Sequence, residues 1–245
     1  MRVIVFCILI GISTTTLAQH GRDKNDTQER REWMRKHLPY MSRTLGASFQ
    51  SFDGINARVA NLPQYKQLKD HAATIGLGWL QEHKQLVSAA AISFGSSMSG
   101  HRDEKSSTIR YIAVNIDFGY DVIKGDRYLL YPFAGLGAQA YQALFYRDNS
   151  AVNFNDVLIS SSLQSNISSV KFKNSYGVYR LGIGFSVKAP KFPSSIGIQA
   201  GYTGSFKRNA WRSNEDQNLA NAPADRINQF YISLVLMSKP MFMMR

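Results

Sequence analysis

The chain has 245 residues, with 29 Lys and Arg against 17 Asp and Glu, so its formal charge is +12. Its 44% apolar and 19% charged residues exclude a disordered chain. A mean hydropathy of −0.23 excludes a bundle of membrane helices, because each helix needs about 20 consecutive apolar residues. The length suits one domain of the β-barrel kind or two small domains.

The first 18 residues have the order of an export signal. Met1-Arg2 is a short positive start, residues 3–12 are apolar, and Thr16-Leu17-Ala18 forms a small-x-small cleavage site. Ten apolar residues are too few for a membrane-spanning helix. We therefore predict a signal peptide over residues 1–18. The single cysteine, Cys7, lies in it, so the mature chain has no disulfide, thiolate metal site or Cys nucleophile.

A charged segment follows over residues 19–39. Asp26 or Thr27 can cap a short helix over 28–37, and Pro39 ends it. One interpretation is a basic contact with lipid headgroups or another protein. The other, which we favour, is a solvated periplasmic leader before the first strand.

From residue 40 onward the hydropathy alternates with a period of two. The clearest segment is 179–188, where apolar side chains alternate with small or polar ones, as in a strand with one apolar face. Similar segments predict eight strands, over 41–51, 73–81, 86–98, 108–123, 128–146, 175–188, 195–206 and 227–237.

The connections between these strands also alternate in length. Those over 52–72, 99–107, 147–174 and 207–226 are long, whereas those over 82–85, 124–127 and 189–194 are short. Long loops at one rim and short periplasmic turns at the other are typical of transmembrane barrels. The sequence therefore predicts an all-β fold, an eight-stranded antiparallel up-and-down transmembrane β-barrel over residues 40–240, with a tail over 241–245.

The non-apolar faces of the strands are rich in glycine and carry charges of both signs. Small residues suit the interior of an eight-stranded barrel, which side chains just fill, so we predict no open pore. Buried charges must be paired, and a proton or ion path is the less favoured interpretation. We predict a structural polar network inside the barrel, made of Asn115, Asp117, Asp121, Gln139, Arg180 and Lys188.

Aromatic residues gather near the predicted strand ends. Rings at the depth of the lipid headgroups form the two girdles of transmembrane barrels. The predicted girdle residues are Tyr40, Phe49, Phe52, Trp79, Tyr120, Tyr128, Tyr131, Tyr146, Tyr176, Tyr179, Tyr202, Phe206, Phe230 and Tyr231.

The chain resembles the small outer membrane β-barrel proteins of Gram-negative bacteria, loosely called OmpA-like or porin-like barrels. The resemblance covers Tyr40 to Pro240 and depends on the segments 45–49, 131–137 and 230–236. It implies a place in the outer membrane and insertion by the barrel assembly machinery. Many such barrels end on an aromatic residue, whereas here Phe242 is followed by Met-Met-Arg.

No catalytic or metal-binding motif occurs, and we predict no enzyme, metal or cofactor. Two alternatives remain. One is a barrel enzyme that modifies lipid or peptide at the outer rim, with His71 and Asp70 near His101, Asp103, Glu104, Ser106 and Ser107. The other is a soluble, lipocalin-like lipid-binding barrel, which requires an apolar interior.

The last long loop carries a predicted basic cluster of Lys207, Arg208, Arg212 and Arg226, with Trp211 among them. Cations at the outer rim attract anionic lipid, so outer membrane lipids such as lipopolysaccharide are the expected partners. Nucleic acid is not expected, because the basic residues are spread over loops and leader and the chain is exported. The expected role is structural or in surface interaction.

Overall fold

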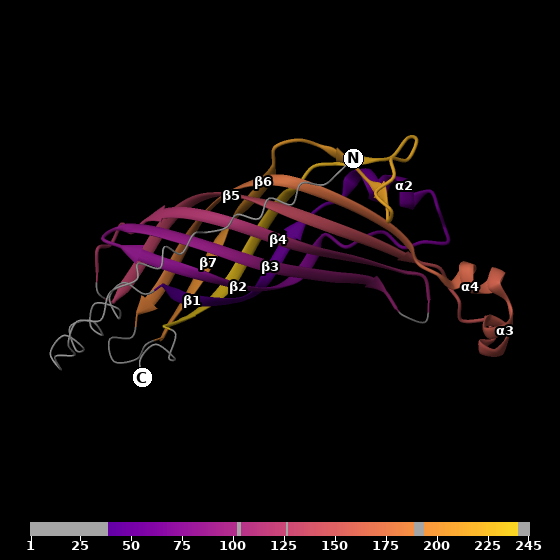
Figure 1. Ribbon diagram of the computed structural model, residues 1–245, viewed down its shortest axis with the longest axis horizontal. Helices are drawn as coiled ribbons and strands as arrows, with labels where there is room; N and C mark the ends of the chain where they lie inside the picture. The colour runs from indigo at the N-terminus through magenta and orange to yellow at the C-terminus, as the bar shows by residue number, and fades with distance from the viewer. Residues whose placement is uncertain (1–38, 102–103, 126, 189–193, 240–245) are drawn as a thin grey trace, which may run out of the picture. The chain divides into compact units, whose positions relative to one another are not determined.

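The computed structural model describes residues 39–101, 104–125, 127–188 and 194–239, all of which belong to one compact unit over 37–245. The predicted signal peptide (1–18), nearly all of the leader (19–39) and the tail (241–245) lie outside the described residues. Eight long strands dominate (Figure 1): β1 Tyr40–Gln50, β2 His71–His83, β3 Leu86–Gly100, β4 Ser106–Tyr120, β5 Tyr128–Tyr146, β6 Val170–Lys188, β7 Ser194–Ser205 and β11 Asn228–Ser238.

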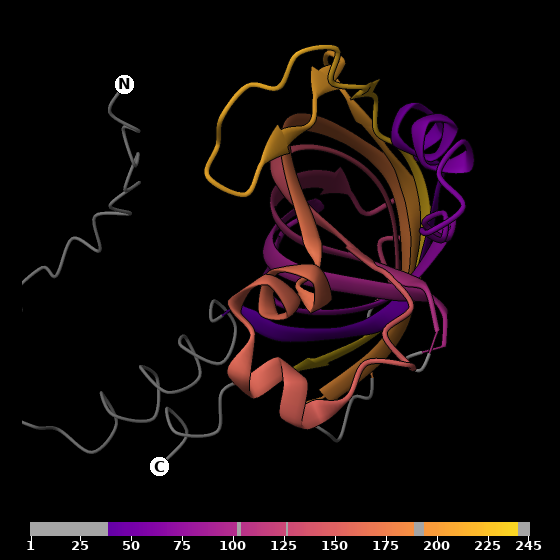
Figure 2. The ribbon, with the colours of Figure 1, turned by 90° about the vertical axis from the view of Figure 1, so that its right-hand side faces the viewer.

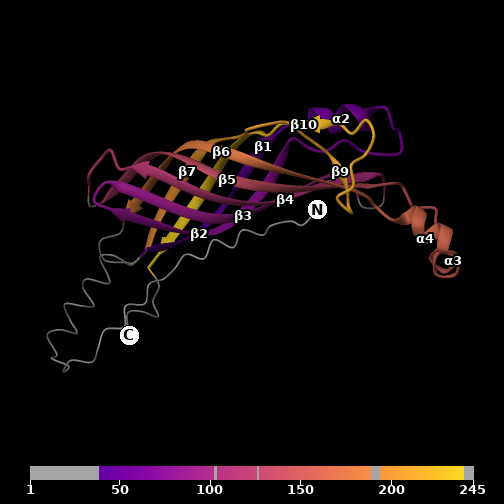
Figure 3. The ribbon, with the colours of Figure 1, turned by 45° about the horizontal axis from the view of Figure 1, so that its top comes forward.

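The shorter elements lie in the long connections. They are the helices α2 Asp53–Ala60, α3 Phe154–Ile159 and α4 Ser161–Ile167, and the two-residue strands β8 Asn209–Ala210, β9 Arg212–Ser213 and β10 Ala224–Asp225. Figure 3 shows α2, β9 and β10 near the long-loop end of the barrel. None of the described helices is long and apolar enough to cross a bilayer.

The long strands form a closed antiparallel ring (Figure 2). Each strand pairs with its neighbour in the sequence, and β1 pairs with β11 from Met41 opposite Ser238 to Gln50 opposite Gln229. Closure leaves no unpaired edge among the long strands. The predicted eight-stranded antiparallel barrel is confirmed.

For the third long connection, over 147–174, the Ser- and Asn-rich sequence predicts a mobile segment or an extension of the hairpin, and the structure shows the extension. The β5–β6 ladder continues to Phe145 opposite Val170, so β6 begins five residues earlier than predicted. The remaining residues form α3 and α4, which lie beyond the strand ends (Figure 1). Side chains of Asn153 and Ser160 cap these helices by accepting backbone N–H groups.

The outward faces of the strands are apolar. Their exposed large side chains form a continuous belt, which includes Leu45, Phe49, Ile75, Leu77, Trp79, Phe94, Val114, Phe118, Leu136, Leu181, Ile183, Ile198, Phe230 and Ile232. A water-soluble barrel would turn these faces inward, so the belt contradicts the lipocalin-like alternative and matches a transmembrane barrel.

The belt predicts a depth-dependent effect of charge. Ile183 is 57% exposed at the middle of the apolar outward stretch of β6, over 179–187. Ile183→Lys is expected to lower the free energy of unfolding in lipid vesicles by about 2–4 kcal/mol, and Val187→Lys, near the strand end, by at most about 1 kcal/mol. Urea titration of both variants is the measurement. Equal losses of free energy of unfolding in the two variants would contradict a belt that faces lipid.

The interior is filled by two apolar clusters separated by polar side chains. The cluster at the short-turn end consists of Leu80, Val87, Leu129, Tyr131, Phe133, Val235 and Met237. The cluster at the long-loop end includes Phe52, Ile55, Val59, Tyr141, Tyr176, Trp211 and Ile227. Inward-facing glycines make room for these rings: a Cβ at Gly182 would lie 2.5 Å from Cζ of Phe133.

Part of the predicted aromatic girdle is wrong. Phe52, Tyr131 and Tyr176 are 3% exposed and pack inside the barrel, and Tyr231 also points inward. Phe49, Trp79, Tyr120, Tyr128, Phe206 and Phe230 are exposed. The inward rings fill the space that the inward glycines leave. The girdle prediction was based on closeness to a strand end, which does not show which way a ring points.

Candidate functional site

A buried ion pair lies at the centre of the barrel interior. Nη1 of Arg180 is 2.5 Å from Oδ2 of Asp117, and Nη2 of Arg180 donates to the hydroxyl of Tyr231 at 2.8 Å. The guanidinium also lies over two rings, 4.9 Å from the centroid of Tyr231 and 5.8 Å from that of Phe133. The buried cation therefore has a carboxylate, a hydroxyl and two aromatic rings around it, which offset the cost of its burial.

A chain of amides and hydroxyls lies on the long-loop side of this pair. Nε2 of Gln139 donates to Oε1 of Gln229 at 3.1 Å, and Nε2 of Gln229 donates to the hydroxyl of Tyr111 at 3.3 Å. The hydroxyl of Tyr141 lies 2.8 Å from Oε1 of Gln139 and 2.7 Å from Oε1 of Gln50. The chain joins strands on opposite sides of the barrel.

A small polar cavity of about 80 Å³ lies in this layer. Oδ1 of Asn115 and Oδ1 of Asp117 are buried without a hydrogen-bond partner among the described residues. Both are acceptors and project from the same face of β4. A cavity of this size and polarity has room for water that would satisfy them.

The other two residues of the predicted interior network lie elsewhere. Asp121 is buried at the short-turn rim, where Oδ1 accepts from the backbone N–H groups of Ile123 and Leu130. Lys188 lies at the end of β6, with Nζ 2.5 Å from Oε2 of Glu82. The six predicted residues thus fall into a central layer and two separate rim contacts rather than one network.

The long-loop end is closed by a contact between the first and the last long loop. Oδ1 of Asp225 accepts from the N–H of Gly54 at 2.6 Å, and Oδ2 accepts from the N–H of Ile55 at 3.2 Å. Oδ2 also accepts from Nε1 of Trp211 at 2.6 Å, and the indole is 1% exposed. Asp225 therefore caps α2 from a distant loop and fixes the Trp211 plug. We call this contact the Asp225 latch.

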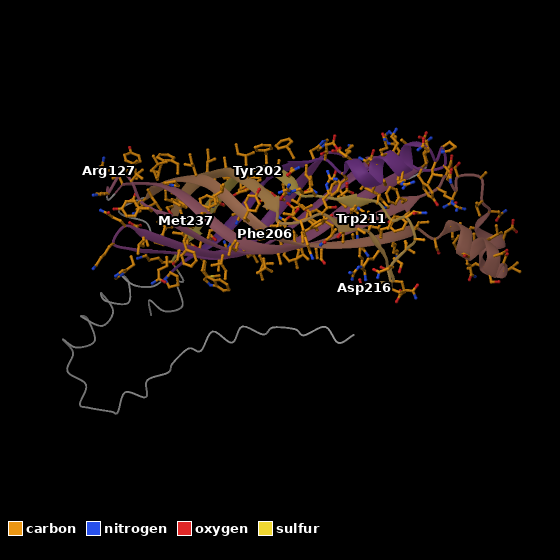
Figure 4. The ribbon with its side chains drawn as sticks, turned by 90° about the horizontal axis from the view of Figure 1, so that it is seen from above. Arg127, Tyr202, Phe206, Trp211, Asp216 and Met237 are labelled. Carbon is orange, nitrogen blue, oxygen red and sulfur yellow. The ribbon has the colours of Figure 1, made fainter. Side chains whose placement is uncertain are left out.

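An open cleft of about 840 Å³ lies on the outer wall near the long-loop end. Its floor consists of β4, β5 and β6, and its other side is the β7–β11 connection, which arches away from the ring of strands in Figure 2. Figure 4 labels Asp216 at the tip of this arch and Trp211 closer to the strands. Four cations line the cleft, Arg110, Lys173, Lys207 and Arg212, against one carboxylate, Asp216.

Strand register places three of these cations in one transverse row. Arg110 lies opposite Gln142, Gln142 opposite Lys173, and Lys173 opposite Arg212. Among the described residues, none of the three forms an ion pair, since the only pairs found there are Asp117–Arg180 and Glu82–Lys188. We call the row of Arg110, Gln142, Lys173 and Arg212, which holds these three cations, the cationic row.

The predicted basic cluster is therefore divided by the structure. Lys207 and Arg212 line the cleft, whereas Arg208 and Arg226 do not. Nε of Arg226 donates to the carbonyl of Ser205 at 3.2 Å. Trp211, predicted among the exposed cations, is buried. The predicted cluster did not include Arg110 and Lys173, because only the β-ladder brings them beside the last loop.

The residues of the enzyme alternative do not form a catalytic group among the described residues. The hydroxyl of Ser107 is buried and donates to the carbonyl of Gln67 at 2.8 Å. His71 and His101 are exposed and make no side-chain hydrogen bond to a described serine or carboxylate. Asp103 lies outside the described residues. No group of three potential metal ligands occurs among the described residues.

No protein-family model matches the sequence, and no curated protein is similar to it. Among solved structures, the chain is similar to the attachment invasion locus protein Ail of Yersinia pestis, crystallised with the heparin analogue sucrose octasulfate. The identity is 14%, the TM-score is 0.48, and the match covers 84% of this chain and 99% of that one.

Two further structures are similar at comparable levels. Neisserial surface protein A has 8% identity and a TM-score of 0.46 over 82% of this chain and 97% of that one. OprG from Pseudomonas aeruginosa has 11% identity and a TM-score of 0.45 over 84% of this chain and 97% of that one. The barrel assignment depends on the chain's own closed ladder and outward apolar belt.

Proposed function

We propose that the chain is a small, closed, non-enzymatic β-barrel of the Gram-negative outer membrane, whose outer face interacts with outer membrane lipids or surface partners. The observation that carries this proposal is the filled interior, in which an apolar cluster lies at each end and a paired charge lies between them. A barrel of eight strands is too narrow for an aqueous channel once side chains fill it.

The elements beyond the belt support a role in surface interaction. Transmembrane barrels direct their long loops to the cell exterior, which here places α2, α3 and the cationic cleft outside. On α3, Phe154, Leu158 and Ile159 are at least 64% exposed although they lie away from the lipid-facing belt. Exposed apolar patches on loops are typical of protein contacts.

We also propose how the chain reaches the membrane. Residues 1–18 direct export, and the barrel assembly machinery then inserts the strands from the periplasm. The leader over 19–39 stays in the periplasm, because an even number of strands returns both chain ends to the short-turn side.

Conductance across a planar lipid bilayer tests the closed barrel. The full mature chain, refolded and inserted, is expected to give no stable open-channel steps at 100 mM KCl or above. The positive control is an established open porin recorded in the same bilayer, because truncating side chains at one end of this barrel would leave the central ion pair and the other apolar cluster in place. Stable ohmic steps from the unmodified protein would contradict the closed barrel and favour a pore.

A further inference from the structure

We infer that the cationic cleft binds the phosphorylated saccharide headgroup of a lipid in the outer leaflet, with the cationic row on its phosphate groups. This inference depends on the proposed outer membrane location and assigns the lipid contact to one site.

The cations of the cleft repel one another. Lys173 and Arg212 face each other directly across the β6–β9 pair, and like charges in that position destabilise a sheet. Neither has an acidic partner within ion-pair distance among the described residues, and Asp216 is the one carboxylate that lines the cleft against four cations. An anion bound between the two side chains would remove the repulsion.

The cationic row lies just above the apolar belt. Directly below the cationic row, toward the short turns, the outward positions are Ile112, Ala140 and Ser175, in register across β4, β5 and β6. Below those lie Val114, Ala138 and Gly177, where the apolar belt begins. The row thus lies at the upper edge of the belt, where headgroups meet the barrel wall. A ligand held there can keep its acyl chains against the belt.

The size and chemistry of the cleft also suit a phosphorylated saccharide. A volume of about 840 Å³ is of the size that holds a small-molecule headgroup. The row extends over roughly 14 Å, since neighbouring strands are about 4.8 Å apart, so it can contact more than one phosphate. Arginine binds phosphate through two parallel N–H groups, and the amides of Gln142, Asn209 and Asn218 can bond to sugar hydroxyls.

Native mass spectrometry of the full mature chain in detergent micelles tests the assignment. Three probes are titrated: a bisphosphorylated acylated glucosamine disaccharide (lipid A), the same lipid without phosphates, and the bisphosphorylated disaccharide without acyl chains. The test variant is Lys173→Gln with Arg212→Gln. The matched control is Lys171→Gln with Arg208→Gln, which removes the same charge from the same two segments but outside the cleft.

The expected result is that lipid A binds the unmodified chain and the control equally within about twofold, and binds the test variant at least roughly tenfold more weakly. The lipid without phosphates and the saccharide without acyl chains are each expected to bind at least about tenfold more weakly than lipid A. A heat-dependent gel shift confirms that each variant is folded, and single variants Lys173→Gln and Arg212→Gln repeat the comparison.

Two results would overturn the inference. Equal loss of affinity in the test and control variants would show that general surface charge, not the cleft, binds the lipid. Equal affinity for the saccharide without acyl chains would show that the ligand is a soluble anionic saccharide. Either result leaves the closed barrel intact, whereas bilayer conductance would overturn the closed barrel without affecting the cleft.

Discussion

Replacing Arg180 with methionine is expected to lower the free energy of unfolding by about 3–5 kcal/mol, because it leaves the buried carboxylate of Asp117 without its cation. Oδ1 of Asp117 already has no partner among the described residues, so in the variant neither carboxylate oxygen would have a protein partner there. Methionine keeps most of the volume between Tyr231 and Phe133. Urea titration of the protein in lipid vesicles, followed by the gel shift between folded and unfolded forms, gives the free energy.

A second substitution separates charge from packing. Asp117→Asn combined with Arg180→Met removes both charges, and it is expected to restore stability to within about 1–2 kcal/mol of the unmodified protein. If the double variant is as unstable as Arg180→Met alone, then Arg180 stabilises the protein mainly through the stacking of its guanidinium on the two rings, and not through the ion pair.

Replacing Asp225 with alanine is expected to open the cap at the long-loop end while the barrel stays folded. Three donors lose their acceptor, the N–H groups of Gly54 and Ile55 and Nε1 of Trp211. Each buried donor left without a partner destabilises the cap by about 1–3 kcal/mol. Amide hydrogen exchange of α2 is therefore expected to accelerate by at least roughly a hundredfold.

Asp216→Ala is the matched control, because Asp216 lies in the same loop and is exposed. It is expected to leave the exchange of α2 unchanged. Asp225→Asn keeps one acceptor oxygen and should give an intermediate acceleration. If Asp225→Ala leaves α2 protected, the apolar contacts of Phe52 and Ile55 are sufficient to hold the cap and the latch is dispensable.

The barrel could be predicted from the sequence because its signals are local. Period-two alternation over 179–188 and the alternating loop lengths each depend on neighbouring residues, and they agree on closure and on the outward apolar face. The two short helices α3 and α4 were missed because their few residues carry no helical periodicity. The caps Asn153 and Ser160 were the available signal.

The sites depend on contacts between residues far apart in the chain. Asp225 and Gly54 are separated by 171 residues, and nothing near Asp225 in the sequence marks it as a helix cap. Part of the cationic row could have been predicted from the sequence. Pairing the residues of β4 and β5 across the short turn that joins them places Arg110 beside Gln142. The pairing of Lys173 with Arg212 could not have been predicted, because β9 is a two-residue strand inside a long loop.

The most direct test of the outward apolar belt and the closed ladder is cell fractionation followed by gel electrophoresis of the extracted protein, unboiled and boiled. The protein is expected in the outer membrane fraction, and its unboiled form is expected to migrate differently from the boiled one, because a closed barrel resists detergent until heated. A water-soluble protein whose mobility does not depend on heating would contradict this expectation, since the belt of apolar side chains would then have to face a core.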